Sequence, residues 1–335
     1  MSTLSSHFFT KINQISPQEH DFTEVLDAIA LTPKTLYFRG KMPENVSKTP
    51  RQKPEQTRTA RPKTVAIVGS RHNTKYGEEV AYKLAYELGK RGVVVVSGLA
   101  YGIDSIAHRG CLTAQGVTVA VLGTPIDRIY PTAHTGLARE IVSQNGAIVS
   151  EYAPHTPEYD AAELAPGEYY ADSGKRTQDP KGSFLYRNRI IAGLSDIVVV
   201  VEAAEQSGSL NTATHALEQG KTVFAVPGNI TNPYSQGCNK FIKQGAIPYT
   251  EPDDVLRELF PEEYLKKRRK LRQQSLICDT DVETKILQAL ASGCRSGEEI
   301  MTHSLLPPEV FNQTITLLEI KSRVRSLGMN AWNLI

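Results

Sequence analysis

Short, mostly apolar runs recur through the middle of the chain, and each is followed by a stretch in which apolar residues have helical spacing. The run 64–68 is rich in β-branched residues and stops at Gly69, which predicts a strand buried on both faces. Over 81–88, apolar residues recur at i, i+3, i+4 and i+7, which predicts an amphipathic helix ending near Gly92. The valines of 93–96 predict the next strand.

The same alternation continues to residue 226. We expect further strands at 117–122, 147–150, 197–202 and 222–226, and helices at 105–115, at 137–144 and after Ser209. Strands that alternate with helices over this length are typical of a doubly wound, mostly parallel α/β sheet of the extended Rossmann-like kind.

The segments around and within this sheet have other patterns. A short strand is expected within 31–40, ahead of a Pro- and Arg-containing linker, and 154–182 has no clear period and predicts a long surface loop. A basic stretch at 266–272 marks a boundary. We therefore expect four parts: an N-terminal segment with basic linker at 1–62, the α/β domain at 63–260, a basic linker at 261–279 and a C-terminal module at 280–335.

The C-terminal module has the pattern of three helices and a hairpin, which predicts a small winged helix. Residues 280–283 and 296–299 both match the capping box, and Pro307-Pro308 can open a third helix. Residues 324–334 predict the hairpin. The third helix, 308–320, contains no Lys or Arg, so we expect this module to contact protein rather than DNA.

Composition narrows the classes of function. The 335 residues are 40% hydrophobic with a formal net charge of only +2, so nucleic-acid contacts would need locally concentrated basic residues. The four cysteines form no Cys-x-x-Cys pair and accompany no His cluster, so we expect reduced thiols and no metal. With no signal-peptide layout and only strand-sized apolar runs, the chain is expected to be cytoplasmic, without membrane contact.

Three glycine-bearing turns follow predicted strands, where open α/β sheets bind ligands. Gly69-Ser70-Arg71 combines close backbone approach, a hydroxyl and a guanidinium suited to phosphate. The turn 97–104 matches neither the dinucleotide fingerprint nor a Walker loop. The turn 207–212 lies at a predicted helix N-terminus, where backbone N–H groups favour an anion. Their convergence at one edge predicts a site for a phosphate-bearing ligand.

The segment 184–195 places aromatic and guanidinium groups side by side. Phe184 and Tyr186 can stack on bases while Arg187 and Arg189 hold phosphates, as single-stranded nucleic acid requires. The alternative is structural: one arginine pairs with a core carboxylate such as Glu202, and the aromatic rings only pack.

Ordered blocks of this sequence resemble the DprA/Smf (DNA-processing protein A) family. The blocks are 65–71, 97–104, 107–108, 119–123, 129–131, 187–195, 201–204, 207–209, 225–228 and 237–239. They follow the family order across 64–258, and the ordered set is specific. The resemblance implies an extended Rossmann-like domain that binds single-stranded DNA, forms a homodimer and loads RecA in natural transformation and recombination, with no catalysis and no cofactor.

The resemblance also implies a binding site. It makes Arg71 the arginine that grips phosphate, with Gly69 and Ser70 shaping the turn. The other expected site residues are Gly98, Lys181, Phe184, Arg187, Asn188, Arg189, Ser207, Gly208, Ser209 and Thr212. Tyr186 stands where many members have a further arginine, so we expect a weaker basic patch here.

Two other functions are consistent with a Rossmann-like domain. LOG-type enzymes cleave nucleotides at a Pro-Gly-Gly-x-Gly-Thr turn, and this chain has Ser207–Thr212 in its place. His108, four residues after Asp104, could be a catalytic base, but no nucleophile accompanies it and we interpret it as structural. The second alternative is a nucleotide-sensing module without catalysis.

Overall fold

The computed structural model describes residues 11–44, 61–154, 169–170, 176–177, 180–266 and 280–334, with backbone alone at 169–170, 176–177 and 180–181. The chain divides into two compact units, Met1–Leu259 and Phe260–Ile335, and each is described by itself. The expected loop at 154–182 and the expected basic linker at 261–279 lie mostly outside the described residues.

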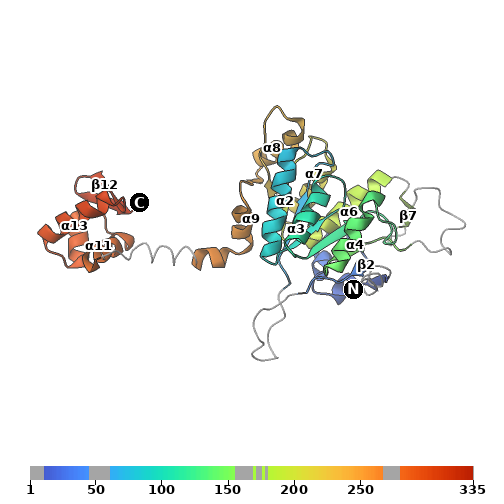
Figure 1. The fold of residues 1–335 in the computed structure, drawn as a ribbon, viewed down its shortest axis with the longest axis horizontal. Helices are drawn as coiled ribbons and strands as arrows, with labels where there is room; N and C mark the ends of the chain where they lie inside the picture. Colours follow the sequence, from blue (N-terminus) through green and yellow to red (C-terminus); the bar gives the residue numbers. More distant parts are fainter. Residues whose placement is uncertain are drawn as a thin grey trace, which may run out of the picture. The chain divides into compact units, whose positions relative to one another are not determined.

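A nine-stranded sheet forms the centre of the first unit (Figure 1). Its strands are β1 (Asn13–Ile15), β2 (Leu36–Gly40), β3 (Thr64–Val68), β4 (Val94–Ser97), β5 (Thr118–Leu122), β6 (Ala147–Ser150), β9 (Ile197–Val200), β10 (Thr222–Ala225) and β11 (Ile247–Pro248). The spatial order is β1-β2-β6-β5-β4-β3-β9-β10-β11. All neighbours from β6 to β11 pair in parallel, while β1 and β2 are antiparallel strands at one edge. The expected mostly parallel sheet is confirmed.

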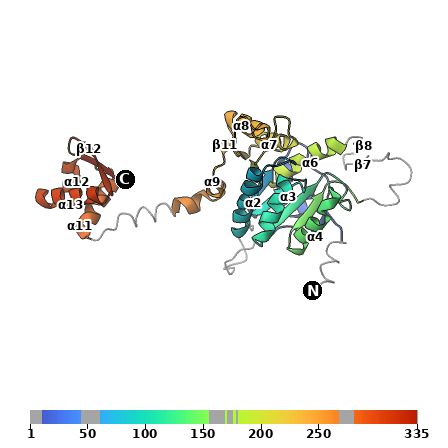
Figure 2. The same cartoon turned by 45° about the horizontal axis from the view of Figure 1, so that its top comes forward.

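Helices cover both faces of this sheet (Figure 2). They are α2 (Lys75–Lys90), α3 (Ile103–Thr113), α4 (Thr135–Ser143), α6 (Pro180–Leu194), α7 (Gly208–Glu218), α8 (Pro233–Lys243) and α9 (Pro252–Leu259), with 3-10 turns η1 (Pro17–Glu19), η2 (Glu24–Ala28) and η3 (Thr132–His134). A further antiparallel pair joins β7 (Tyr169–Tyr170) to β8 (Arg176–Thr177).

Alternate residues of each strand pack against different helices, which explains why the strands are apolar along their length. On β5, Val119 and Val121 share a core with Ile190 of α6. The intervening Ala120 belongs to a second core with Leu137 of α4. Because neither face of a parallel sheet is open to water, every strand position favours an apolar side chain.

The N-terminal segment contributes to the sheet. The strand expected within 31–40 is present as β2, which pairs antiparallel with β6, with Tyr37 opposite Ser150. Arg61 also joins the α/β layer, since its Nη2 lies 3.3 Å from the Asp196 carboxylate. Nothing in the local sequence pattern of 31–40 identified β6 as its partner, because pairing across 110 or so residues depends on tertiary packing.

The second unit contains the expected three helices and hairpin. They are α11 (Asp281–Ala291), α12 (Gly297–Ser304), α13 (Pro308–Ile320), β12 (Val324–Gly328) and β13 (Ala331–Leu334). The capping box at α12 is formed, with Glu299 N donating to Ser296 Oγ and Ser296 N donating to the Glu299 carboxylate, each at 3.2 Å. At α11 only the threonine half forms, because Glu283 instead accepts from Lys321 Nζ at 2.8 Å. Assignment of this unit as a winged helix stays a prediction.

Two features bear on the expected absence of membrane and metal sites. Among the described helices, none combines the length and apolarity needed to span a bilayer. Within the same part of the chain, no three or more His, Cys, Asp or Glu side chains gather as metal ligands would. Cys111 and Cys238 are buried free thiols, and Cys278 lies outside the described residues.

His108 is buried inside the first unit as a neutral imidazole. The Thr118 hydroxyl donates to Val95 O at 2.7 Å, so its oxygen accepts from His108 Nδ1, also at 2.7 Å. Burial, aided by the nearby His134 and Arg187, lowers the pKa of His108 to about 3. The unfolded chain therefore binds a proton here below pH ~6.5, whereas the folded chain does not until about pH 3.

We expect His108 to make the protein less stable in mild acid. Between pH 7 and pH 5 this one group should lower the free energy of unfolding by about 2 kcal/mol, since only the unfolded state gains its proton. His108→Asn keeps an amide that can reach Thr118 but does not titrate, so it should lose correspondingly less stability over the same range. Urea unfolding of both proteins at the two pH values tests this, and equal losses would contradict it.

Candidate functional site

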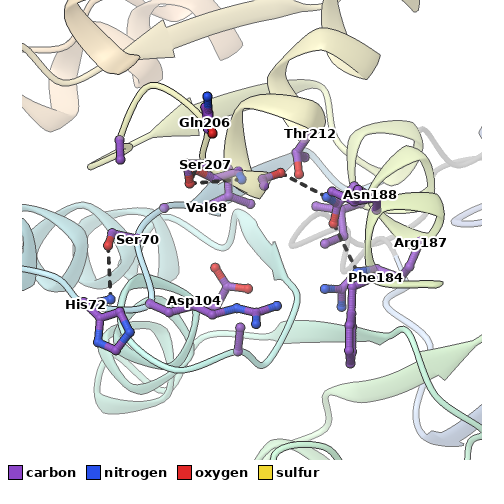
Figure 3. A pocket seen from close by; sticks show the side chains of 18 of the residues that line it. Val68, Ser70, His72, Asp104, Phe184, Arg187, Asn188, Gln206, Ser207 and Thr212 are labelled. Carbon is purple, nitrogen blue, oxygen red and sulfur yellow. Dashed lines mark hydrogen bonds between the residues drawn. The ribbon is translucent and has the colours of Figure 1, made fainter. Parts of the chain in front are cut away.

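A crevice of about 680 Å³ opens at the carboxyl edge of the sheet, between β3 and β9 (Figure 3). The chain leaves β3 toward β4 on one side, and β9 continues to β10 on the other, so the strand order reverses at this point. Such a switch point separates the loops of two neighbouring strands and is where open α/β sheets bind ligands.

Most of the expected site residues line this crevice. They are Gly69, Ser70, Arg71, Phe184, Arg187, Asn188, Ser207, Gly208, Ser209 and Thr212. Gly98 and Arg189 do not line it, and the side chain of Lys181 lies outside the described residues. The turns after β3 and β9 therefore meet, as their positions at strand ends predicted, and the start of α6 joins them.

Arg71 is exposed at the crevice, in a turn that the backbone fixes. The Ser70 carbonyl accepts from Ile103 N at 3.2 Å, and the Ser70 hydroxyl accepts from His72 N at 3.0 Å. Gly102 has a φ of +72°, and a Cβ there would collide with the Ser70 carbonyl. The guanidinium carbon of Arg71 lies 5.6 Å from the ring centroid of Phe184, within cation–π range.

The start of α7 forms the opposite wall. Ser207 is the N-cap, and its hydroxyl lies 2.8 Å from the Ser209 hydroxyl. Asn188 of α6 fixes this turn by donating from Nδ2 to Gly208 O and to Asn211 Oδ1, each at 3.2 Å. Two hydroxyls and the start of a helix thus line the same crevice as an exposed guanidinium, an arrangement suited to anionic oxygen.

Arg187 lies beneath the crevice and is only 4% exposed. Its Nη1 donates to Gly98 O at 3.0 Å and to Val121 O. Burial lowers the pKa of Arg187 to about 10, against the opposing effect of the Asp104 carboxylate. The guanidinium is thus engaged by the protein itself, and its expected contact with DNA stays a prediction.

Asp104 is the buried counter-charge of Arg187. Its Oδ2 accepts from Gly98 N at 3.1 Å, and burial raises the pKa of this carboxyl, while Arg187 and the N–H groups of Ala100 and Gly98 act to lower it. A Cβ on Gly98 would stand 2.7 Å from both Asp104 Oδ2 and Arg187 Nη2. Gly98 therefore acts by leaving room for this pair under the crevice floor.

Arg189 lies away from the crevice. This agrees with the structural alternative, in which one of the two arginines pairs with a core carboxylate. It is 3% exposed, with Nη2 at 2.6 Å and Nη1 at 2.9 Å from the Glu151 carboxylate. Its guanidinium carbon lies 3.8 Å from the ring centroid of Tyr186, so that ring packs on the arginine. The partner carboxylate is Glu151 and not Glu202, which instead accepts from the backbone N–H and hydroxyl of Thr74.

Several crevice residues were missed from the sequence. Asp104, Tyr130, Leu185, Gln206 and Tyr234 also line the cavity. Tyr130 follows β5 as Arg71 follows β3, so its position after a predicted strand was a usable signal. Asp104 and Gln206 likewise follow β4 and β9. Leu185 and Tyr234 follow no such rule, because their approach to the crevice depends on how α6 and α8 pack.

Comparison with known proteins relates the chain to DNA-processing proteins. The family model described as DNA recombination-mediator protein A matches residues 13–163 and 167–260. Protein Smf of Escherichia coli strain K12 is 46% identical over 195 residues, which cover 58% of this chain and 46% of that protein. DNA processing protein DprA of Bacillus subtilis strain 168 is 38% identical over 248 residues, 74% of this chain and 71% of that protein.

A solved structure agrees with the sequence matches. DNA processing protein A of Helicobacter pylori, whose structure was described for a unique mode of binding single-stranded DNA, aligns with a TM-score of 0.56 and 30% identity. The alignment covers 77% of this chain and 98% of that one. By contrast, the match to the E. coli protein spans less than half of that relative's own length.

Proposed function

The chain belongs to the family of DNA recombination-mediator protein A, the DprA/Smf proteins, and from this premise we propose that it binds single-stranded DNA in the crevice between β3 and β9. The observation that carries the proposal is the meeting of an exposed guanidinium, an aromatic ring and a helix N-terminus in one crevice. Single strands are held in this way, by aromatic stacking of bases and by cations and N–H groups on phosphates.

Each wall has its own part in this proposal. Arg71 grips a phosphate, which a planar fork of donors does well, and Phe184 receives a base beside it. A neighbouring phosphate accepts from the hydroxyls of Ser207 and Ser209 and from the first N–H groups of α7. Lys181 would add charge at the start of α6.

We propose binding without catalysis. The carboxylate that lines the crevice, Asp104, already accepts from backbone N–H groups and balances a buried arginine. His108 is fully buried and bonded to Thr118, so it has no access to a bound ligand. These engagements favour a binding role over nucleotide cleavage, and no cofactor enters the proposal.

The partners follow from family membership alone. We propose that the chain forms a homodimer in the cytoplasm and loads RecA onto the bound strand during recombination and natural transformation. The C-terminal unit would then contact protein, which the absence of Lys and Arg from α13 supports.

Electrophoretic mobility shift with a labelled single strand, and with the same strand annealed to its complement, tests the proposal. The single strand should bind more tightly, and its affinity should fall with salt with a log–log slope of about −0.7 for each phosphate contacted. Equal affinity for both DNAs would overturn single-strand selectivity. Steady release of base or phosphate from nucleotides would favour the enzyme alternative.

A further inference from the structure

Two exposed tyrosines extend the edge on which the crevice lies. Tyr101 follows β4 and Tyr130 follows β5, the next two strands in order beside β3. The side chains are 48% and 50% exposed, although the nearby Ile126 and Ile129 are buried. The loops of this edge therefore bury their aliphatic residues and present their tyrosines to solvent.

Both tyrosine rings are held by packing. The Tyr130 ring centroid lies 5.3 Å from that of Phe184, the ring that Arg71 also contacts. The Tyr101 ring packs edge-on to His134, with centroids 5.0 Å apart. His134 is itself buried, with Nδ1 2.8 Å from Leu99 O. Rings that are already positioned cost little side-chain entropy when a ligand stacks on them.

We propose that Tyr130, which also lines the Arg71 crevice, and Tyr101, which does not, form a second subsite, the tyrosine shelf, on which further bases of the same single strand stack. The inference rests on the proposed function and deepens it. Neighbouring strands are about 4.8 Å apart, so β3 and β5 are separated by about 10 Å. At roughly 3.4 Å for each stacked base, that distance accommodates two or three nucleotides.

The exposed tyrosine rings of the shelf are better suited to stacking on bases than to packing against an aliphatic surface of a protein partner. The shelf is continuous with the crevice through the contact between Tyr130 and Phe184. Phosphates would be gripped on the β9 and β3 side, where Arg71 and Ser207 lie, and bases would be received on the β4 and β5 side. Because every base has a π-face, the shelf is tolerant of sequence.

Affinity as a function of oligonucleotide length tests the shelf. Wild-type protein should gain affinity as a thymidine oligonucleotide is lengthened beyond the shortest one that binds. In the double variant Tyr101→Ala/Tyr130→Ala, longer oligonucleotides should bind more weakly by about tenfold for each lost ring. Tyr101→Ala alone leaves the crevice lining intact, so it should bind the shortest oligonucleotide as wild type does and lose affinity only for longer ones. Tyr130→Phe keeps the ring and should behave as wild type.

Matched controls separate the possible failures. Tyr82→Ala removes a 40% exposed tyrosine on α2 that does not line the crevice, and should leave every affinity unchanged. If Arg71→Ala weakens binding but the double variant is unaffected at all lengths, the shelf is wrong and the tyrosines serve another partner, such as a protein. If wild type binds no single strand, the proposed function itself fails.

Tryptophan fluorescence at the shelf provides a second measurement of base stacking. The chain has one tryptophan, Trp332, in the second unit, so Tyr130→Trp adds a reporter at the shelf that wild type lacks. Stacking of a base should quench its fluorescence when oligonucleotide is added, relative to wild type. Unchanged fluorescence at saturating oligonucleotide would overturn the shelf even if the alanine variants bind more weakly.

Discussion

Arg71→Ala is expected to weaken binding of single-stranded DNA by about tenfold to a hundredfold at constant salt, the range for loss of hydrogen bonds to a charged group. Arg71 is exposed, and its guanidinium lies near the Phe184 ring, so its removal should leave folding intact. The salt dependence should fall too, by about 0.7 in log–log slope, because one fewer phosphate is neutralised. Fluorescence anisotropy with a labelled oligonucleotide over a salt series measures both quantities.

Two variants control this experiment. Arg71→Lys keeps the charge but lacks the planar fork, so it should recover only part of the lost affinity. Arg109→Ala removes another exposed arginine, on α3, which does not line the crevice, and should have no effect. A similar loss for Arg71→Ala and Arg109→Ala would mean that binding depends on general charge and not on the crevice.

Arg187→Met is expected to lower the free energy of unfolding by about 3–5 kcal/mol, the usual cost of removing one member of a buried charge pair. The side chain is 4% exposed and donates to the carbonyls of Gly98 and Val121. Methionine fills a similar volume, so the lost stability should come from removal of the guanidinium's charge and hydrogen bonds and not from a cavity. The Asp104 carboxylate would remain buried without its cation. Urea unfolding of the variant and wild type measures the difference.

A double-mutant cycle can test whether Arg187 and Asp104 stabilise each other. Adding Asp104→Asn to Arg187→Met removes the uncompensated carboxylate, so the double variant should be more stable than the sum of the two single effects implies. A positive coupling energy would show that Arg187 and Asp104 stabilise each other. If Arg187→Met proves as stable as wild type but loses DNA binding, the guanidinium contacts DNA directly and our structural account of it is wrong.

The strands from β3 to β10 in the sheet were predictable because their physical requirements are local, whereas the short edge strands β1 and β11 were not predicted. Every residue of β3, β5 and β6 is buried, so an apolar run bounded by glycine or polar residues identifies each of them. The helix α6 was not recognised as a helix. Its Arg187, Asn188 and Arg189 are all buried, so the segment lacks the polar and apolar alternation by which a surface helix is identified.

The sequence by itself determined the alternation of strands and helices, the family, and the strand-end turns in which Arg71 and Ser207 lie. Only the tertiary structure decided which arginines are available to a ligand. Arg71 is exposed, whereas Arg187 is buried, donates to backbone carbonyls and has Asp104 as a counter-charge, and Arg189 is paired with Glu151. A buried cation needs a partner charge nearby, and that partner is set by packing between segments distant in sequence, which no local pattern encodes.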